Sequence, residues 1–528
     1  MVATGSGPRG LVRGLPQAGE PPPLHGWSLV LVTFALAMGN FMEVLDLTIA
    51  NVAVPTIAGD LGVSAGQGTW VITSYAVANA ISVLLAGFLS QRFGQVRVFT
   101  VALILFSTTS LLCGFAHSFG LLVFARVMQG AVSGLMVPLS QALLLASYPP
   151  ERRAIGMAIW AMTITAAPAI GPILGGWLCD NAGWSWIFFI NVPFGLTAAA
   201  LTWGQLAGRE TRRVQVPIDW VGLGLIVIWV GSLQIMLDKG NELDWFGSSF
   251  ITGLGVTALI GFALFIAWEL TDRHPIVDLR LFARRSFTGA TAALAIGFAI
   301  FFATVVLVPL WLQTQLGYTA TWAGLVVAPT GLFAVLLAPV VAKTMNRIDP
   351  RWYATAAFVV FAVGNWWRAA FTTDATAWDY ALPQVLMGFA VALFFAPLIT
   401  LALAALPPSS VAQGSGIANF LRMTAGAFAA SLVITLWDHR QADNAAALTT
   451  GLSPLDPALV QAGSAATTLG ASPEQALALV QQQLASQAAH LGVLDVFWFS
   501  GWAFIIAIGA IWIAGRYQPE KGPGLGAH

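Results

Sequence analysis

The sequence predicts an all-α polytopic membrane protein. Of its 528 residues, 57% are hydrophobic and only 9% are charged, with a mean hydropathy of +0.79. The surface of a water-soluble domain needs far more charge than this. Apolar stretches long enough to cross a bilayer as helices recur along the chain, and positive charges collect in every second connection between them.

Windows of about 20 apolar residues predict fourteen membrane spans. The predicted spans are 29–57, 68–89, 98–117, 120–147, 155–179, 186–206, 217–237, 249–270, 287–314, 320–342, 353–371, 380–404, 413–436 and 493–515.

The distribution of Lys and Arg predicts that both termini are cytoplasmic. With the N-terminus inside, eighteen of the 23 Lys and Arg residues fall in cytoplasmic segments. Only Lys239 and Arg440 fall in outer segments, and Arg126, Arg368 and Arg422 lie within spans. Because cytoplasmic loops are enriched in Lys and Arg, this asymmetry favours an N-in, C-in topology. Residues 1–26, rich in Gly and Pro, are then expected to form a disordered cytoplasmic tail, and residues 517–528 a second tail.

Charge balance and cysteine content narrow the chemistry further. The formal net charge is 0 and the pI is about 7.0, which argues against a nucleic-acid partner. The two cysteines, Cys113 and Cys179, both fall near the predicted outer ends of spans. They could form a disulfide or remain two thiols.

Two carboxylates lie inside the first span, in the segment FMEVLDLTIANVAVP. Ionisable groups at this depth are costly, so Glu43 and Asp46 are candidates for proton coupling. Three residues apart on a helix, they share one face. The alternative for each is a structural carboxylate that is hydrogen-bonded between helices.

The fourth predicted span carries Arg126 and Gln129 within RVMQG. An arginine inside a membrane must find a carboxylate, a carbonyl or a water-filled cavity. We expect Arg126 to be the counter-charge of Asp46, and a structural clamp between helices is the alternative. Burial and a neighbouring guanidinium act in opposite directions on a carboxyl group's affinity for protons, so such a pair can respond to what enters the cavity.

Polar and aromatic side chains inside other spans are candidates to line a substrate cavity. Arg422 follows Asn419 deep enough in its span to face such a cavity, whereas Arg368 lies near an outer end and is expected to snorkel. The predicted cavity residues are Asn40, Tyr75, Gln129, Asn419 and Arg422.

Glycine and proline cluster in two further motifs. In the fifth span, glycines would let backbones pack closely and prolines would loosen the helix, so the segment predicts either close packing or a bend at a moving interface. Its residues are Pro168, Gly171, Pro172, Gly175 and Gly176. The connection after the second span predicts a tight cytoplasmic turn with basic residues: Gly87, Gln91, Arg92, Gly94 and Arg97.

Several activities are not supported by motifs in the sequence. A P-loop requires G-x-x-x-x-G-K-[ST], and the only Lys followed by Ser or Thr is Lys343, which Ala342 precedes. There is no H-E-x-x-H metal motif, and the single G-x-S-x-G match, GVSAG, sits in a turn between two spans. No metal or organic cofactor is expected, which leaves a proton-coupled carrier or a channel.

The segments LDLTIANVAVP, GFLSQRFGQVRVF, RVMQG, AIGPILGGWL, WSWIFFINVPFG and GIANFLRMTAG together resemble a known family. They are similar to the signature motifs of the fourteen-span drug:proton antiporters of the major facilitator superfamily, the EmrB/QacA type. The resemblance extends from about residue 29 to residue 515. One departure is Gln91, where the family's loop motif usually has an acidic residue, so the resemblance carries no charge-relay role over to this position.

The resemblance implies a major facilitator fold: two six-helix bundles, at 27–206 and 286–516, with a linker at 207–285 that carries two inserted helices. It further implies proton-driven efflux of hydrophobic or amphipathic toxic compounds across a bacterial inner membrane by alternating access, with the proton-motive force as energy source. Membrane lipid, a periplasmic adaptor and an outer-membrane channel would be partners. Export of an endogenous metabolite, such as a siderophore or fatty acid, is the alternative function.

The outer segment 437–492 is the one long connection. Its stretch Pro473–His490 combines helix formers with an apolar stripe, which predicts a peripheral amphipathic helix. This helix would be either a solvated cap or a docking surface for a partner.

Overall fold

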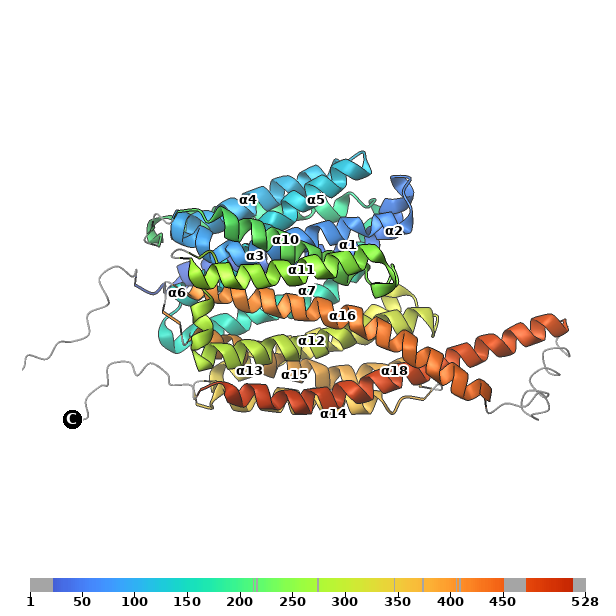
Figure 1. Ribbon diagram of the computed structural model, residues 1–528. Helices are drawn as coiled ribbons and strands as arrows, with labels where there is room; N and C mark the ends of the chain where they lie inside the picture. Colours follow the sequence, from blue (N-terminus) through green and yellow to red (C-terminus); the bar gives the residue numbers. More distant parts are fainter. Residues whose placement is uncertain are drawn as a thin grey trace, which may run out of the picture.

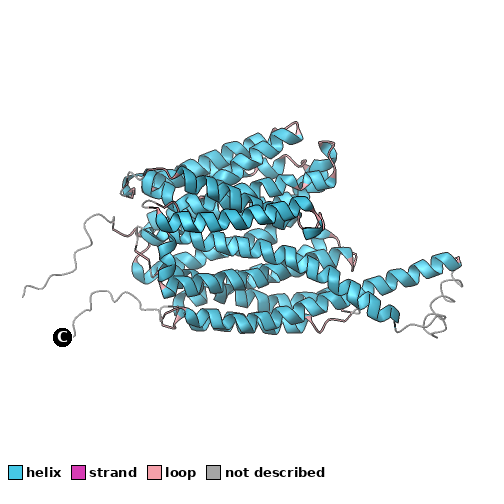
Figure 2. Ribbon diagram, in the orientation of Figure 1, coloured by secondary structure: helices cyan, strands magenta, loops and turns pink. Residues whose placement is uncertain are grey.

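The computed structural model describes residues 22–211, 213–214, 217–272, 275–345, 347–372, 375–404, 406–407, 410–450 and 472–515. These residues form long α-helices joined by short turns and 3₁₀ segments (Figure 2). Residues 1–21 and 516–528, which hold most of the two predicted tails, and residues 451–471 of the outer segment lie outside the described residues.

The α-helices, in chain order, are α1 (Gly26–Asp60), α2 (Ala65–Gly68), α3 (Trp70–Phe93), α4 (Gln95–Gly114), α5 (Phe119–Ser133), α6 (Met136–Ser147), α7 (Arg153–Asn181), α8 (Trp186–Phe189), α9 (Asn191–Leu206), α10 (Trp220–Lys239), α11 (Ser249–Thr271), α12 (Arg285–Thr314), α13 (Ala320–Thr344), α14 (Pro350–Arg368), α15 (Ala377–Leu403), α16 (Val411–Thr450) and α18 (Pro473–Ile513).

The helices follow the predicted spans. Among the described residues, twelve helical segments are long and apolar enough to cross a membrane. The two remaining long helices, α7 and α14, pack within the same body, α7 against α1 and α13 and α14 against α15 and α18. Each predicted span therefore has a helical counterpart, and fourteen crossings stay a prediction.

The predicted fourth span is interrupted once. Between α5 and α6 the helix loosens at Gly134, where a side chain would overlap the backbone carbonyl of Asn79 on α3. Glycine here lets this helix and α3 approach closely. Within each helix the backbone N–H and C=O groups remain hydrogen-bonded to each other, as a lipid environment requires.

The body has two halves with α10 and α11 between them (Figure 1). Helices α1 to α9 form one half, and α12 to α18 form the other. α10 packs against α3 of the first half and α16 of the second, where Trp229 meets Phe420 edge to face at 5.5 Å between ring centroids. The inserted pair therefore bridges the two halves along one side.

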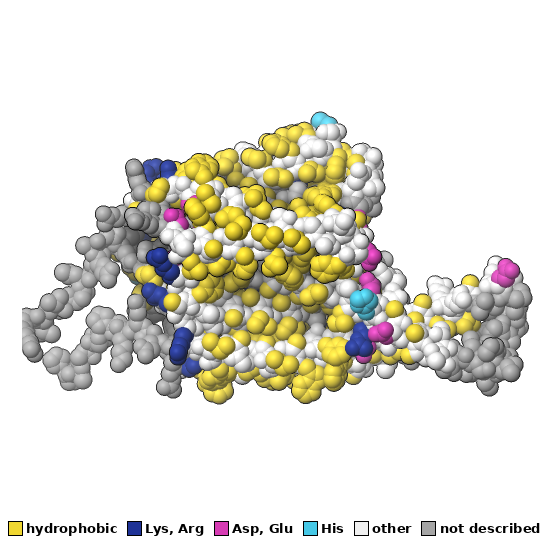
Figure 3. Space-filling model, in the orientation of Figure 1, with side chains coloured by type: hydrophobic (Ala, Val, Ile, Leu, Met, Phe, Trp, Pro, Cys, Tyr) yellow, Lys and Arg dark blue, Asp and Glu magenta, His cyan; other side chains and the backbone are white. Residues whose placement is uncertain are grey.

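Charged side chains mark the two ends of the body. On the face shown in Figure 3, Lys and Arg gather mostly at the end where α1 begins and α18 ends, with a belt of hydrophobic side chains beyond them. We call this the basic end. It is the end that the sequence predicts to be cytoplasmic, and the orientation in a membrane stays a prediction.

The two halves touch closely toward the basic end. A Cβ atom on Gly87 of α3 would lie 2.5 Å from the Cβ of Gln413 on α16, and one on Gly416 would lie 2.7 Å from the carbonyl oxygen of Val83. Gln141 of α6 accepts hydrogen bonds from Ser415 and Asn419 of α16. Small residues and amides therefore join the halves on this side.

Helices α16 and α18 extend beyond the opposite end of the body and cross there (Figure 1). α16 has 40 residues and α18 has 41. At about 1.5 Å per residue each is about 60 Å long, roughly twice the thickness of a bilayer's hydrocarbon core. We call this projection the hairpin, made of 438–450 and 472–490.

The hairpin corrects the prediction of a peripheral helix at Pro473–His490. The stretch is helical, but it is the first half of α18 and continues into the last predicted span without a break. Capping by Ser472 and Gln475 starts the helix there. Below it, Trp437 of α16 donates a hydrogen bond to the carbonyl of Ala489 (2.9 Å), so the base of the hairpin is packed rather than lying on a membrane surface.

The glycines of α7 make a testable prediction about packing. A methyl group on Gly171 would overlap the Thr48 side chain of α1, whose hydroxyl already donates to Leu45 (3.0 Å), whereas a Cβ on Gly176 would meet nothing within 4 Å. Overpacking typically costs about 1–3 kcal/mol. We expect Gly171→Ala to lower the melting temperature of the purified protein.

Gly176→Ala is the matched control on the same helix. Alanine is a better helix former than glycine by at most about 1 kcal/mol, so the control should melt at the wild-type temperature or slightly above it. Equal melting temperatures for both variants would show that close packing of α7 on α1 does not depend on Gly171.

Candidate functional site

Helix α1 carries three buried polar residues on one side, each close to a helical turn apart. Asn40, Glu43 and Asp46 are 0%, 2% and 1% exposed. Residues three apart on a helix face the same neighbours, which here lie on α3, α5, α7 and α9. The carboxylates that the sequence singles out are therefore deep inside the first half.

Asp46 and Arg126 form a buried ion pair. The Nη1 of Arg126 on α5 lies 2.5 Å from the Oδ2 of Asp46, and both side chains are at most 1% exposed. The guanidinium also donates to the carbonyl of Val71 (2.9 Å) and to the Oε1 of Gln129 (2.8 Å), leaving Nη2 without a partner. Arg126 thus pairs with Asp46 as expected, and Gln129, which the sequence predicts to line a substrate cavity, contacts the same pair.

Three residues that sequence reasoning missed or assigned elsewhere complete this cluster. Asn191 of α9 donates to the Oδ1 of Asp46 (2.8 Å) and to Ser110 (3.1 Å). The ring of Tyr75 lies 4.1 Å from the guanidinium carbon of Arg126, as a cation–π contact. Tyr75, which the sequence predicts to line a substrate cavity, therefore contacts the ion pair through Arg126. Asn191 could have been found as the one amide within the apolar motif WSWIFFINVPFG.

Glu43 has a separate environment. Its Oε1 accepts a hydrogen bond from Asn79 of α3 (2.9 Å), which also donates to Ser133 (2.8 Å). Its Oε2 is buried and has no hydrogen-bond partner. A carboxyl oxygen left open in this way can hold a proton or accept a bond from a ligand.

Arg422 brings the second half toward Glu43. It lies on α16, 6% exposed, with its guanidinium carbon 4.6 Å from the ring centroid of Phe298. Its Nη2 donates to Asn419 (3.2 Å), which in turn donates to Gln141 across the two halves (3.0 Å). Glu43 and Arg422 act electrostatically on each other. The predicted pair Asn419 and Arg422 therefore sits at the contact between the halves.

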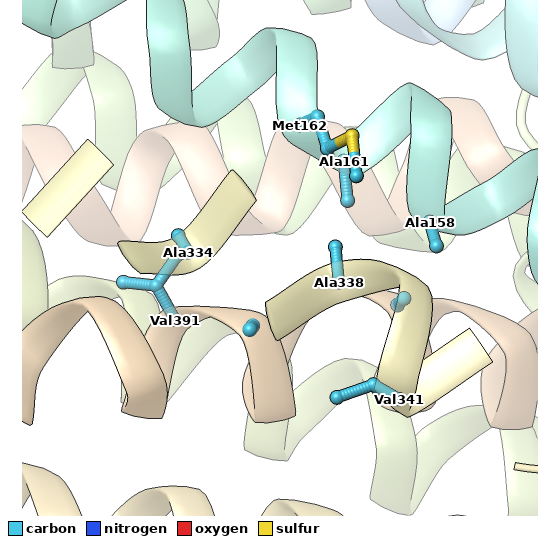
Figure 4. A pocket seen from close by; sticks show the side chains of 9 residues that line it. Ala158, Ala161, Met162, Ala334, Ala338, Val341 and Val391 are labelled. Carbon is cyan, nitrogen blue, oxygen red and sulfur yellow. The ribbon is translucent and has the colours of Figure 1, made fainter. Parts of the chain in front are cut away.

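The predicted substrate residues do not form one cavity in this structure. Asn40 donates to Thr163 of α7, Tyr75 and Gln129 belong to the Asp46 cluster, and Asn419 and Arg422 lie on α16. A small pocket does open between α7, α13 and α15 (Figure 4), and it is lined only by apolar side chains. None of the predicted polar residues lines this pocket.

The glycine motif of α7 lies beside Asp46. Gly171 faces Thr48, and a Cβ on Gly175 would lie 3.1 Å from the carbonyl of Ile49, both on the α1 segment that follows Asp46. Gly176 has open space around it, so only two of the three glycines serve close packing. The side chains of Pro168 and Pro172 lie outside the described residues, although α7 continues through both positions.

The cytoplasmic loop motif is held by the segment that precedes α10. Gly94 has a φ of +95°, which favours glycine, and the carboxylate of Glu210 lies against it. Glu210 accepts from the backbone N–H groups of Val96 and Arg97, each at 3.0 Å, so it caps α4. Gln91 is half-buried and its carbonyl accepts from Val214 (2.9 Å). Gly87 meets α16, and Arg92 lies 5.6 Å from the Phe93 ring.

Two further expectations concern residues outside these clusters. Arg368 does not snorkel: it is 3% exposed and donates to Gln384 at 2.5 Å. Its position at the end of α14 points it into the second half because α15 and α18 cover that face. Cys113 and Cys179 form no disulfide in the described chain, and the Cys113 thiol faces Gln129 at 3.5 Å.

The arrangement combines two chemical functions. A carboxylate paired with one arginine can lose that pairing when it takes up a proton, and a second carboxylate near the other half can take up a different cation. Both groups lie on one face of α1, one helical turn apart.

Comparison with known proteins identifies the family. The Major Facilitator Superfamily profile matches residues 36–430. The chain is 47% identical over 494 residues to the multidrug export protein EmrB of Haemophilus influenzae, covering 93% of this chain and 97% of that protein. It is 46% identical over 514 residues to EmrB of Escherichia coli K12, covering 96% and 100%. It is 45% identical to the fatty acid resistance protein FarB of Neisseria gonorrhoeae, covering 96% and 99%.

Solved structures agree on the fold. The proton:xylose symporter XylE superposes with a TM-score of 0.59 at 14% identity, covering 93% of this chain and 97% of that one. The human organic anion transporter MFSD10 gives a TM-score of 0.55 at 14% identity, covering 93% and 100%. At this identity the likeness concerns the fold alone. Together with the sequence matches, it establishes that the chain is a multi-pass membrane transporter of the major facilitator superfamily, within its EmrB-type group.

Proposed function

We propose that this protein is a multidrug exporter that exchanges protons for hydrophobic or amphipathic compounds by alternating access. The observation that carries the proposal is the buried Asp46–Arg126 pair, at 2.5 Å, one turn from a second buried carboxylate with an open oxygen. The similarity to EmrB proteins supports drugs as substrates.

In this proposal Asp46 is the main proton carrier. Protonation removes its negative charge, and Arg126 then keeps only the neutral acceptors Val71 and Gln129. The loss of attraction frees α1 to shift against α7, on which it packs through Gly171. Since α7 also contacts α13 of the other half, the shift reaches the contact between the halves.

The energy for export comes from the proton-motive force in this proposal. One proton moving down a potential of 100 mV supplies about 2.3 kcal/mol. That free energy sustains roughly a fiftyfold concentration gradient of the exported compound. No metal or organic cofactor is required.

Glu43 and Arg422 are the proposed substrate contacts. A cationic drug would bind at the open Oε2 of Glu43 and supply the attraction that Arg422 now exerts on this carboxylate. An acidic compound would pair with Arg422 instead, where the rings of Phe298 and Phe395 supply stacking surface. Opposite charges facing one another across the halves thus account for a broad substrate range.

Export of a fatty acid or a similar lipophilic acid is the second candidate function. It is favoured by the 45% identity to FarB and by Arg422, whose Nε is buried without a partner. In either case the chemistry at Asp46 is the same, because only the exported compound differs.

We further propose fourteen crossings of a bacterial inner membrane with both termini inside. The hairpin then projects about 20–30 Å into the periplasm, since its helical arms, 438–450 of α16 and 473–490 of α18, rise by about 1.5 Å per residue. A periplasmic adaptor that binds the hairpin and continues to an outer-membrane channel is the proposed partner. Exposed apolar residues such as Leu479, 50% exposed, offer it a contact surface.

The first prediction concerns proton coupling. In proteoliposomes with an imposed pH gradient, Asp46→Asn should reduce proton-driven exchange of a fluorescent drug by at least about tenfold, because the neutral amide cannot exchange a proton. Asp60→Asn is the matched control: the same substitution at the exposed end of the same helix. Wild-type exchange by Asp46→Asn would contradict the assignment, and drug flux without any pH dependence in the wild type would indicate a channel.

The second prediction separates Glu43 from Asp46. Because Glu43 is assigned to substrate, Glu43→Gln should weaken binding of a cationic drug while leaving export of a neutral drug coupled to protons. Equal loss of cationic and neutral drug export would instead make Glu43 a group of the proton pathway. Initial rates for two drugs of similar size and different charge provide the measurement.

The third prediction concerns the hairpin. Leu479→Glu should weaken co-purification of the periplasmic adaptor, because it places a charge in the proposed contact. Leu243→Glu, at a 40% exposed outer position away from the hairpin, is the control. Exchange in proteoliposomes should be unchanged in both variants, and adaptor recovery equal to wild type with Leu479→Glu would count against the contact.

A further inference from the structure

The second half of the body holds buried positive charge without a buried counter-charge. Among its described residues, from α12 to α18, Arg368 and Arg422 are buried and no Asp or Glu is. Arg422 has Glu43 opposite it in the first half. Arg368 forms no ion pair within the described chain.

The surroundings of Arg368 are polar, neutral and enclosed. Its Nη2 donates to the Oε1 of Gln384 at 2.5 Å, and the same oxygen accepts from Thr330 at 2.9 Å. Asn365, one turn earlier on α14, is 0% exposed, and its Oδ1 has no partner. The cluster thus joins α13, α14 and α15 through neutral groups only.

Two donors of this guanidinium are unused. Nε and Nη1 of Arg368 are buried without a hydrogen-bond partner. The Phe497 ring of α18 covers the guanidinium at 5.7 Å, which keeps water away from that side. A buried charge with open donors is costly unless an anion or further acceptors satisfy it.

We infer that Arg368, with Gln384 and Thr330, forms an anion site in the outer part of the second half. The ligand class is a monovalent anion, either the carboxylate of a lipophilic acid or a halide. Nε–H and Nη1–H lie on opposite edges of the planar guanidinium, each edge shared with Nη2, so an anion can accept a hydrogen bond from the open donor of either edge. Phe497, which covers the guanidinium, belongs to an apolar cluster that also contains Phe371 and Val496, and such apolar side chains suit the body of a lipophilic acid.

This site is distinct from the proposed proton and drug contacts. It uses no residue of the Asp46 or Glu43 clusters, and its ligand can be detected by equilibrium binding without a pH gradient. A failed exchange experiment and a failed anion experiment are therefore separate results.

The test uses the full-length protein in lipid nanodiscs and follows its melting temperature. The probes are benzoate, its uncharged isostere benzamide, and chloride titrated against sulfate at constant ionic strength. We expect benzoate or chloride, but not benzamide, to stabilise the wild type in a dose-dependent way. Arg368→Gln should weaken the apparent affinity of that anion by about tenfold or more. Which of the two anions responds identifies the source of the ligand.

Two control variants locate the effect. Arg440→Gln makes the same change at a half-buried arginine of the hairpin, next to the Phe499 ring at 5.1 Å, and should respond like the wild type. Arg422→Gln, at the proposed contact for acidic compounds, measures any share of the response that comes from Arg422 instead of Arg368. A response lost in Arg422→Gln but kept in Arg368→Gln would overturn the assignment, as would the absence of any anion response in the wild type.

A second variant covers the case in which Arg368→Gln does not fold. Arg368→Lys keeps the charge but lacks the planar fork of donors. It should still respond to the anion, with an affinity lowered several-fold. A response identical to that of the wild type would contradict a site built on Nε and Nη1.

Discussion

A charge inside a hydrocarbon layer must be matched by an opposite charge or by hydrogen-bonding groups, and the centre of the first half is built around that constraint. Asp46 and Arg126 satisfy it for each other at 2.5 Å, within a shell that adds Val71, Gln129 and Asn191. Five elements, α1, α3, α5, α8 and α9, meet at this pair. A change in the charge of Asp46 therefore acts directly on the contacts of these five elements.

Close packing connects the Asp46 cluster to the neighbouring helices. Gly171 and Gly175 bring α7 directly against the part of α1 that follows Asp46, and Gly87 and Gly416 bring the two halves together near the basic end. Where side chains are absent, the backbones of neighbouring helices can approach one another closely. Glu210 of the linker accepts hydrogen bonds from the first turn of α4, beside Gly94, and so attaches the loop motif to the linker.

The helices and the ion pair could be predicted from the sequence because both follow from one rule: polar and charged groups in lipid must be paired within the protein. Every predicted span has a helix, and Arg126 meets Asp46 as expected. Asn191, Asn79 and Glu210 were missed because an amide in a span or a carboxylate in a linker has many possible partners, and only the packed structure selects one. The continuity of α18 was missed because the polar half of this helix has no apolar run to mark it as part of the last span. Arg368 was placed at a lipid surface because a position near a helix end does not reveal which neighbours cover it.

If Asp46 carries the proton that is exchanged for a drug, drug binding must release that proton. A saturating cationic drug is added to the purified protein in weakly buffered solution, and released protons are read with a pH indicator. Proton release is expected from the wild type, and none is expected from Asp46→Asn that still binds the drug. Equal release from both proteins would contradict this role of Asp46.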